Sequence, residues 1–374
     1  MVMKLSLLSA LCLLLLLPFS VFGQFEQADD KKPAAITKTL FDDIEPQFVV
    51  LQVMGNDDAD ALDWILKMTE SRRNPDSSRI RMTFFINAAD LRSTHNILRK
   101  ARKRGHEFAN FTYSRFVDTL GVSIDARLLP EAIWYEEVIK NDSLISKRLG
   151  IPRNQIVGFR APRFEYNEAA FRVLARRGFK YDASIEEFDE NQQPYDLKDG
   201  SRADSVWAVS RKYGGYRPAG KVAGLWQLPA YQWTIPHDSL ARIYGFEPGL
   251  RRRAFAIDDT FDTISGKIRG TDVRAFGVSE IGGLEMKDNE VLATIKHSFD
   301  LHREGSSAPF TFSITPSMYV RQSNRLASSV GDHRQRRKII EEAVDYMLSF
   351  ENVRFSHGKK VVGYMKNKPK KAEE

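Results

Sequence analysis

The fold is decided by the stretch Phe48-Val49-Val50-Leu51-Gln52-Val53-Met54-Gly55-Asn56-Asp57-Asp58. Its first six residues form an apolar run of strand length. The next segment, 59–70, carries Leu62, Ile65, Leu66 and Met68 near helical spacing, so a helix is expected there. The stretch therefore predicts a buried strand that ends in two carboxylates and leads into a helix.

The same alternation continues along the chain. Strands are predicted at 82–86, 106–111, 156–160, 225–228, 309–314 and 353–355, and helices at 91–104, 128–149, 168–177, 289–304 and 334–350. Residues 185–289 show no such regularity apart from the strand at 225–228. Strands that alternate with helices of this length indicate an α/β fold with a parallel sheet, whose site lies at the carboxyl ends of the strands.

The first 23 residues have the pattern of a signal peptide. Lys4 precedes an apolar run, and Val21 and Gly23 stand where a signal peptidase requires small residues. An uncleaved membrane anchor is the alternative, because the run is about long enough to span a bilayer. We expect a signal peptide at 1–23, a leader at 24–45, a globular domain at 46–365 and a disordered basic tail at 366–374. No later segment is a transmembrane candidate, and the expected location is secreted, periplasmic or in the cell envelope.

The chain is basic and has one cysteine. It has 374 residues and a formal net charge of +7, and Cys12 lies in the apolar run of the signal peptide. The mature protein would therefore carry no disulfide. Basic clusters at 99–104, 251–253, 334–338 and 366–371 could attract anionic polymers, but solvated helix faces and a basic tail explain them better. No nucleic-acid partner is expected, because no nucleic-acid-binding motif accompanies the clusters.

The paired carboxylates Asp57 and Asp58 admit two interpretations. One could ligate a metal while the other acts as general base toward a bound water. Alternatively, one of them caps the helix that begins at Ala59. Taken alone, the pair favours the cap.

Five further segments along the chain favour the catalytic interpretation of Asp57 and Asp58 over the helix cap. They are 82–86 (Met-Thr-Phe-Phe-Ile), 105–109 (Gly-His-Glu-Phe-Ala), 158–162 (Gly-Phe-Arg-Ala-Pro), 225–229 (Leu-Trp-Gln-Leu-Pro) and 308–310 (Ala-Pro-Phe). With the paired aspartates, they resemble the motifs of the polysaccharide deacetylases, carbohydrate esterase family 4, and in particular the chitin deacetylase-like branch. The similarity runs from about residue 48 to 365. It implies an incomplete (β/α) barrel and a site that removes N-acetyl groups from sugar polymers with one divalent metal, usually zinc.

The resemblance assigns roles to individual residues. Asp57 corresponds to the catalytic base and Asp58 to a metal ligand, and Arg160 in the third motif belongs to the catalytic set. Pro162, Trp226 and Leu228 fall at substrate-binding positions, with the tryptophan at the wall of the acetyl pocket.

Other family positions are occupied by residues that cannot do the same chemistry. Phe111 and Arg115 stand where the family has two metal-binding histidines, and Pro316 stands where it has the general-acid histidine. Arg163 stands at a position that is aromatic in the family. Phenylalanine offers no lone pair and arginine is a permanent cation, so one carboxylate would remain to hold the metal. No cofactor is therefore predicted. If the protein is active, we expect it to use zinc or another divalent metal.

The remaining histidines do not replace the missing ones. Side chains alternate along a strand, so His106 is expected to face the helical layer and Glu107 to lie about 13 Å deeper in the barrel than the ligand position. His297 and His302 are five residues apart on a predicted helix, and a solvent-facing role is expected for both.

Arg115 suggests a more specific hypothesis. Its guanidinium could pair with Asp57 or Asp58 and place a fixed positive charge where the family keeps a metal. Equally, Arg115 could point into solvent from a displaced loop. Aromatic residues of the irregular region could stack on sugar rings, although burial in the core is favoured for them: Trp207, Tyr213, Tyr216, Tyr231 and Trp233.

Three functions remain open. The first is a non-catalytic protein that binds an N-acetylated polysaccharide, chitin-like or peptidoglycan-like. The second is an active hydrolase of carbon–nitrogen bonds that deacetylates a polysaccharide through a rearranged site. The third is a structural envelope or matrix protein that presents a basic surface.

Overall fold

The computed structural model describes residues 45–117, 122–184, 225–305, 308–320 and 332–367. The predicted signal peptide, almost all of the leader and the aromatics Trp207, Tyr213 and Tyr216 lie outside these ranges. None of the helices in the described ranges is both long and apolar enough to cross a membrane.

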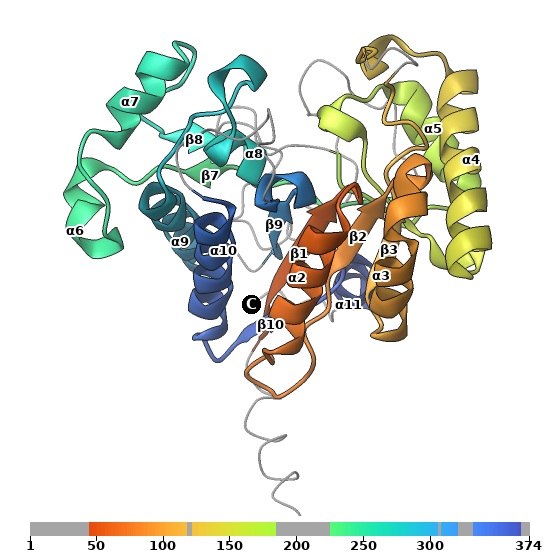
Figure 1. Cartoon of the computed structure of the whole chain (residues 1–374), viewed down its shortest axis with the longest axis horizontal. Coiled ribbons are helices and arrows are strands. Elements are labelled where there is room, and N and C mark those ends of the chain that lie inside the picture. Colours follow the sequence, from red (N-terminus) through yellow and green to blue (C-terminus); the bar gives the residue numbers. More distant parts are fainter. Residues whose placement is uncertain (1–44, 118–121, 185–224, 306–307, 321–331, 368–374) are drawn as a thin grey trace, which may run out of the picture.

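A curled parallel sheet forms the centre of the molecule (Figure 1). Strand β1 (Gln47–Met54) pairs with β2 (Thr83–Ile86), β9 (Phe310–Ile314) and β10 (Val353–Phe355), all parallel. The sheet continues through β3 (Glu107–Asn110), β4 (Gly158–Phe159), β5 (Tyr181–Asp182) and β6 (Trp226–Gln227). Among the described strands β6 and β9 do not pair, so the barrel is incomplete, as predicted.

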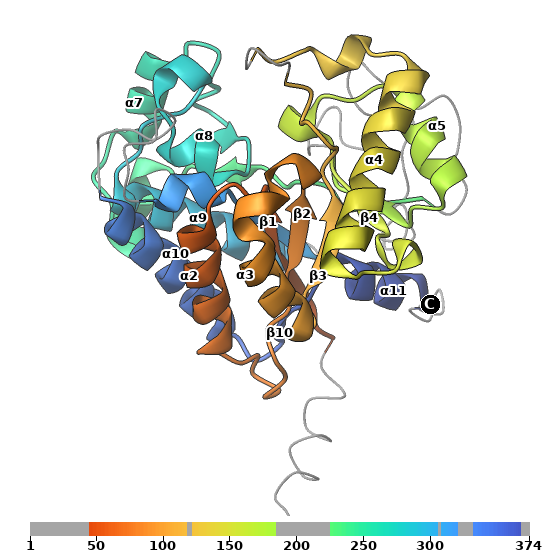
Figure 2. The same ribbon diagram turned by 45° about the vertical axis from the view of Figure 1, so that its right-hand side comes forward.

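Helices cover the outside of this sheet (Figure 2). They are α2 (Ala59–Glu70), α3 (Leu91–Lys103), α4 (Glu131–Leu149), α5 (Glu168–Arg177), α9 (Asp288–Gly305) and α10 (His333–Leu348). The alternating strand residues Val49, Leu51 and Val53 share one buried cluster with the apolar faces of α2, α3 and α10, whereas Phe48 and Val50 belong to a second cluster. The two clusters show that β1 is buried on both faces, as expected of a continuous apolar run.

The region predicted to be irregular contains short elements. These are β7 (Trp233–Thr234), α6 (Ala241–Tyr244), α7 (Leu250–Ile257), β8 (Lys267–Ile268) and α8 (Asp272–Phe276), with β7 and β8 antiparallel. These short elements were not predicted individually, because elements of two to eight residues are too short to show a clear periodicity. Tyr231 and Trp233 are buried, which confirms the core interpretation for these two aromatics.

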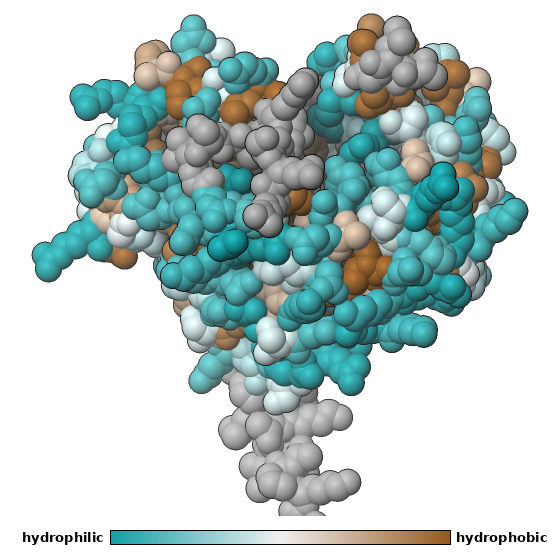
Figure 3. All heavy atoms as spheres, viewed as in Figure 1, coloured by the Kyte–Doolittle hydropathy of each residue, from teal (hydrophilic) through white to brown (hydrophobic). Residues whose placement is uncertain are grey.

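Two further boundaries differ from the prediction. Helix α4 begins at Glu131 and not at Leu128, since Pro130 precedes it and residues 126–128 form a separate 3₁₀ turn. Helix α11 (Gly358–Asn367) was not predicted, and it includes the first two residues of the expected basic tail. Figure 3 shows the surface of the molecule in the view of Figure 1. This face is mainly hydrophilic, with hydrophobic patches near the top, including the region of α7 and α8.

Candidate functional site

The loop after β1 is fixed by two residues at the start of the aspartate motif. Gly55 has φ +84°, a conformation that L side chains rarely adopt, so glycine is required there. Asn56 is fully buried; its Oδ1 accepts a hydrogen bond from the backbone N–H of Asn87 at 3.0 Å, and its Nδ2 donates to Thr94 Oγ1 at 3.3 Å. Asn56 therefore joins the loops that follow β1 and β2.

The two carboxylates of this loop have different partners. Asp58 caps α2, because its Oδ1 accepts from the backbone N–H of Ala61 at 2.8 Å. The capping interpretation is thus confirmed for Asp58. The Asp57 side chain is 32% exposed and faces Arg115. Partial burial raises the pKa of Asp57, and the nearby Arg115 guanidinium offsets part of this rise.

Arg115 reaches this carboxylate from the loop after β3. Its Nη1 lies 4.0 Å from Asp57 Oδ2, the outer limit of a salt bridge, and its Nη2 lies 3.2 Å from Asp90 Oδ2. The hypothesis that Arg115 pairs with a motif carboxylate therefore stands for Asp57. Asp90 is a second partner that the sequence did not indicate. Phe111, at the other histidine position, is buried with its ring 6.5 Å from that of Phe85.

The loop that carries Arg115 has an unusual backbone. Thr112, Arg115 and Phe116 have φ values of 62°, 58° and 54°, which are strained for residues other than glycine. Local hydrogen bonds hold this conformation: Thr112 Oγ1 accepts from the backbone N–H of Arg115 at 3.1 Å, and Asn110 Oδ1 accepts from that of Thr112 at 2.8 Å. Strain of this kind is commonly found at functional sites.

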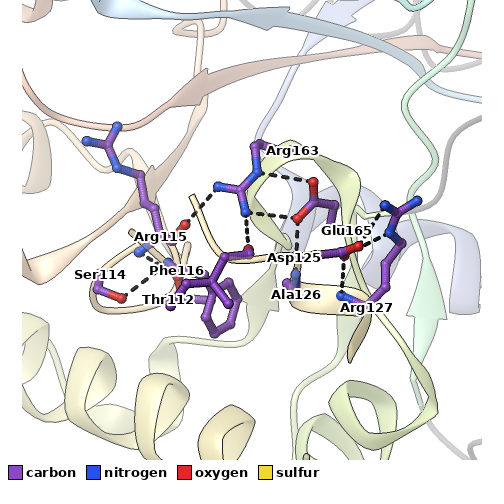
Figure 4. A network of polar contacts seen from close by, with 10 residues as sticks. Thr112, Ser114, Arg115, Phe116, Asp125, Ala126, Arg127, Arg163 and Glu165 are labelled. Carbon is purple, nitrogen blue, oxygen red and sulfur yellow. Dashed lines mark hydrogen bonds and ion pairs between the residues drawn. The ribbon is translucent and has the colours of Figure 1, made fainter. Parts of the chain in front are cut away.

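Arg163 connects this loop to the one after β4 (Figure 4). Its guanidinium donates to the backbone carbonyls of Arg115 at 3.0 Å and Ile124 at 2.7 Å, and it forms an ion pair with Glu165 at 2.8 Å. Arg163 thus replaces the aromatic residue of the family motif with a polar link between two loops.

An aromatic ring is nevertheless present one residue later. Arg163 and Phe164 both have positive φ, 55° and 60°. The Phe164 ring centre lies 4.3 Å from Cζ of Arg160 and 5.2 Å from Cζ of Arg269. Phe164 was not predicted from the sequence, although its place directly after Pro162-Arg163 could have indicated it.

Arg160 lies inside the barrel. It is 1% exposed, and its Nη1 donates to Gln52 Oε1 and to Ser313 Oγ, the latter at 3.1 Å. The nearby Asp182 was also missed by the sequence analysis. Burial raises the pKa of this carboxyl to about 6, while hydrogen bonds from Ser184 oppose the rise. These residues form a polar layer below the mouth of the barrel.

The remaining predicted substrate-binding residues lie near this layer. Pro162 is buried at the start of a 3₁₀ turn, Pro162–Phe164, and Leu228 is buried just after β6. Trp226 is half-buried and packs against the same apolar cluster as Leu228. Their roles toward a substrate remain predictions.

Pro316 occupies a turn with no titratable side chain. It is buried and begins a 3₁₀ turn, Pro316–Tyr319, after β9. The preceding Thr315 donates from its backbone N–H and its Oγ1 to Asp272, at 2.6 and 3.0 Å. Burial raises the pKa of Asp272 to about 6. Because Asp272 is fully buried, it fixes this turn and does not reach a substrate.

Three histidines outside the motifs are buried or half-buried in the described part of the chain, where they contact backbone and side-chain groups. His106 faces the helical side, where its Nδ1 accepts from the backbone N–H of Met82 at 3.3 Å, and burial lowers its pKa to about 3. The solvent-facing role predicted for His297 and His302 was wrong. His297 is buried, and His302 lies against the backbone carbonyl of Ala308 at 2.8 Å with its pKa lowered by burial to about 4. That packing depends on a loop close to β9, which helical spacing alone could not indicate.

The donor set at the mouth does not fit a divalent metal. Among the described residues, no group of three or more His, Cys, Asp or Glu side chains could hold an ion. Asp57 faces a guanidinium, which repels a second cation and cannot ligate one. No catalytic step through a metal follows from these residues.

Comparison with known proteins agrees with this fold. The family model described as polysaccharide deacetylase matches residues 76–181, which include β2 to β4 and the loops that carry Arg115 and Arg160. This match supports the resemblance of the chain to the polysaccharide deacetylases. No curated protein is significantly similar to this polysaccharide deacetylase-like chain in sequence.

Solved structures share the fold at low identity. A protein from Mycobacterium smegmatis assigned as a polysaccharide deacetylase is 13% identical, with 89% of this chain and 96% of that one covered and a TM-score of 0.53. A similarly assigned protein from Pseudomonas aeruginosa PAO1 is 13% identical, with 87% and 93% covered and a TM-score of 0.50. A family 4 carbohydrate esterase pseudoenzyme from Bacillus anthracis is 8% identical, with 85% and 66% covered; its TM-score of 0.42 supports no inference about this chain.

Proposed function

We propose that this polysaccharide deacetylase-like chain is a secreted or envelope protein that binds an N-acetylated polysaccharide, with little or no metal-dependent hydrolysis. The observation that carries the proposal is the Arg115 guanidinium, which lies between Asp57 and Asp90 at the mouth of the barrel. The N-terminal apolar run supports export.

The chemistry of the replaced positions explains why hydrolysis would be lost. Arg115 supplies a permanent positive charge next to Asp57, which corresponds to the catalytic base of the family, so no divalent ion is needed to neutralise this carboxylate and none is attracted to it. Phe111 offers no lone pair, and Pro316 has no proton to give to a leaving amine. The partly buried aromatic side chains Phe164 and Trp226 remain near the mouth, and aromatic side chains suit the binding of sugar rings.

Polymer retention and metal content test the proposal together. Purified protein should be retained on insoluble chitin or peptidoglycan and should hold no stoichiometric zinc after incubation with the ion and gel filtration. Retention on neither polymer would contradict the binding function and would favour the structural alternative. Stoichiometric zinc would contradict the loss of the metal site.

Restoring the family residues provides a second test. The triple variant Phe111→His, Arg115→His, Pro316→His should bind zinc, measured by elemental analysis and competition with a chromogenic chelator. The single variant Phe111→His is the matched control, because it adds an imidazole while Arg115 keeps its charge at the site. A folded triple variant without zinc affinity would show that the motif positions are misassigned.

A second candidate function has one observation in its favour. The raised pKa of Asp57 suits a general acid or base, so a hydrolase with a rearranged, metal-independent site is the alternative. Acetate release from N-acetylglucosamine oligomers, abolished by Asp57→Asn, would establish this function. Release that is absent, or that survives Asp57→Asn, would reject it.

A further inference from the structure

A cavity of about 770 Å³ lies beside the mouth, outside the segment that matches the family model. Its walls come from the hairpin of β7 and β8 and from the segments around α7 and α8, which lie together on one side of the molecule in Figure 1. The volume falls within the ~300–1,000 Å³ range of small-molecule sites. The lining residues used below are Gln232, Phe261, Ile264, Lys267, Arg269 and Ile281.

The lining combines an apolar surface with groups that can form hydrogen bonds. Ile264 and Ile281 are 88% and 42% exposed, and Phe261 is buried in the core. The Oε1 atom of Gln232 is buried without a hydrogen-bond partner. A buried acceptor without a hydrogen bond raises the free energy of the folded protein. Binding of a ligand that donates an N–H or O–H group to Gln232 Oε1 would remove this cost.

The charges around the cavity nearly cancel. Three basic residues and two aspartates line the cavity, and Arg274 forms an ion pair with Asp258: Lys267, Arg269, Arg274, Asp258 and Asp262. In the part of the chain that the structure describes, no carboxylate lies within 4.0 Å of the Lys267 ammonium, which leaves it able to donate to a ligand hydroxyl. This balance fits a neutral sugar better than a polyanion.

Arg269 connects the cavity to the mouth. It lines the cavity, and its guanidinium lies 5.2 Å from the Phe164 ring centre, which in turn lies 4.3 Å from the guanidinium of Arg160 in the barrel. A chain of sugar rings that leaves the mouth beside Phe164 would therefore reach the side of the cavity that Arg269 lines.

From these contacts we infer that the cavity is a second saccharide subsite, which takes one or more N-acetylhexosamine rings of the same polymer chain that occupies the mouth. The inference rests on the proposed polysaccharide-binding function. The apolar C–H face of a ring packs on Ile264 and Ile281, an acetamido N–H or a hydroxyl donates to Gln232 Oε1, and Lys267 donates to a ring hydroxyl.

Oligomers of N-acetylglucosamine with two to six residues test the subsite by calorimetry. The hexamer should bind about tenfold or more tightly than the dimer, because it can occupy mouth and cavity together. Gln232→Ala and Lys267→Ala should each remove most of this gain and leave dimer binding unchanged. Lys338→Ala is the matched control, since Lys338 is an exposed lysine on α10, away from the cavity.

A local measurement accompanies the affinities. Methyl signals of Ile264 and Ile281 should shift with the hexamer, whereas that of Ile243, 73% exposed on α6, should not. Equal affinity for dimer and hexamer, or a length gain that survives both variants, would overturn the subsite while the polysaccharide function stands. Failure of the wild-type protein to bind any oligomer or polymer would overturn the proposed function and, with it, this inference.

Discussion

The two ends of the barrel hold their charged groups in different ways. At the end closed by α11, Glu107 is 6% exposed, and its Oε2 accepts from Thr83 Oγ1 and from the backbone N–H of Lys359, both at 2.9 Å. His357 lies 3.6 Å away. The carboxylate also meets the amino terminus of α11, where the helix dipole favours a negative charge.

The open end is arranged more loosely. Asp57 and Arg115 are each about one-third exposed, their closest atoms are 4.0 Å apart, and the Arg115 loop contains three residues with positive φ. A charge held by short hydrogen bonds in the interior contributes to folding, whereas an exposed ion pair on a strained loop contributes little. The comparison teaches that stability depends on the closed end and that function is to be sought at the open end.

The largest expected effect is at the closed end. Glu107→Ala leaves the Thr83 hydroxyl and the backbone N–H of Lys359 without their acceptor, so the free energy of unfolding should fall by about 3 kcal/mol. Urea denaturation measures the change. Lys359→Ala is the control, because Lys359 bonds to Glu107 through its backbone and its side chain is exposed. Similar losses in both variants would mean that α11 is held by something other than Glu107.

A smaller effect is expected at Asp142, which supports the open end from behind. Its Oδ1 accepts from Asn110 Nδ2 at 2.6 Å, and burial raises its pKa to about 7 from the ordinary 3.8. Between about pH 4 and pH 7, Asp142 is therefore protonated in the folded protein and ionised in the unfolded chain. The stability contributed by protonated Asp142 is complete below pH 4 and is lost as the pH rises through 7.

Asp142→Asn should remove this part of the pH dependence. Relative to the wild-type protein, the variant should gain on the order of 2 kcal/mol in unfolding free energy between pH 4.5 and pH 7.5. Urea titrations of both proteins at the two pH values measure the difference. Parallel pH profiles would show that Asp142 is already ionised at pH 4.5 in the folded protein.

Arg163 offers a sharper contrast within the open end. Both Arg163 and Arg127 pair with a carboxylate two residues away, but Arg163 also donates to the carbonyls of Arg115 and Ile124 (Figure 4). Arg163→Ala should lower the unfolding free energy by about 1 kcal/mol and speed amide exchange in the 112–117 loop. Arg127→Ala should leave exchange in that loop unchanged. Equal exchange in the two variants would contradict the role of Arg163 as a link between loops.

The smallest change in stability is expected at Arg115. Arg115→Ala should alter the unfolding free energy by less than about 0.5 kcal/mol, because solvent screens a pair whose side chains are each about one-third exposed. The pKa of Asp57 should rise further, since Arg115 now lowers it. Carboxyl NMR titration measures the shift, with Arg172→Ala as the control, because Arg172 pairs with Glu131 and Glu168 and keeps the Arg115 loop intact. An unchanged Asp57 titration would place the guanidinium away from this carboxylate in solution.

The regular elements could be predicted because their pattern is local. The strands at 83–86 and 353–355 and the helix at 168–177 follow from apolar periodicity, and the capping role of Asp58 follows from its place before Ala59. The short elements between residues 233 and 276 could not be predicted, since they are stabilised by packing against distant parts of the chain.

The sequence by itself determined the parallel α/β order, the carboxylates at the end of the first strand and the absence of imidazole at three family positions. These properties depend only on residue type and spacing. The tertiary structure decided that Arg115 meets Asp57 and Asp90, that Phe164 covers Arg160, and that Asp182 and Asp272 are buried. Contacts between residues tens of positions apart depend on how the strands close and how the loops turn, and local propensity carries no record of either.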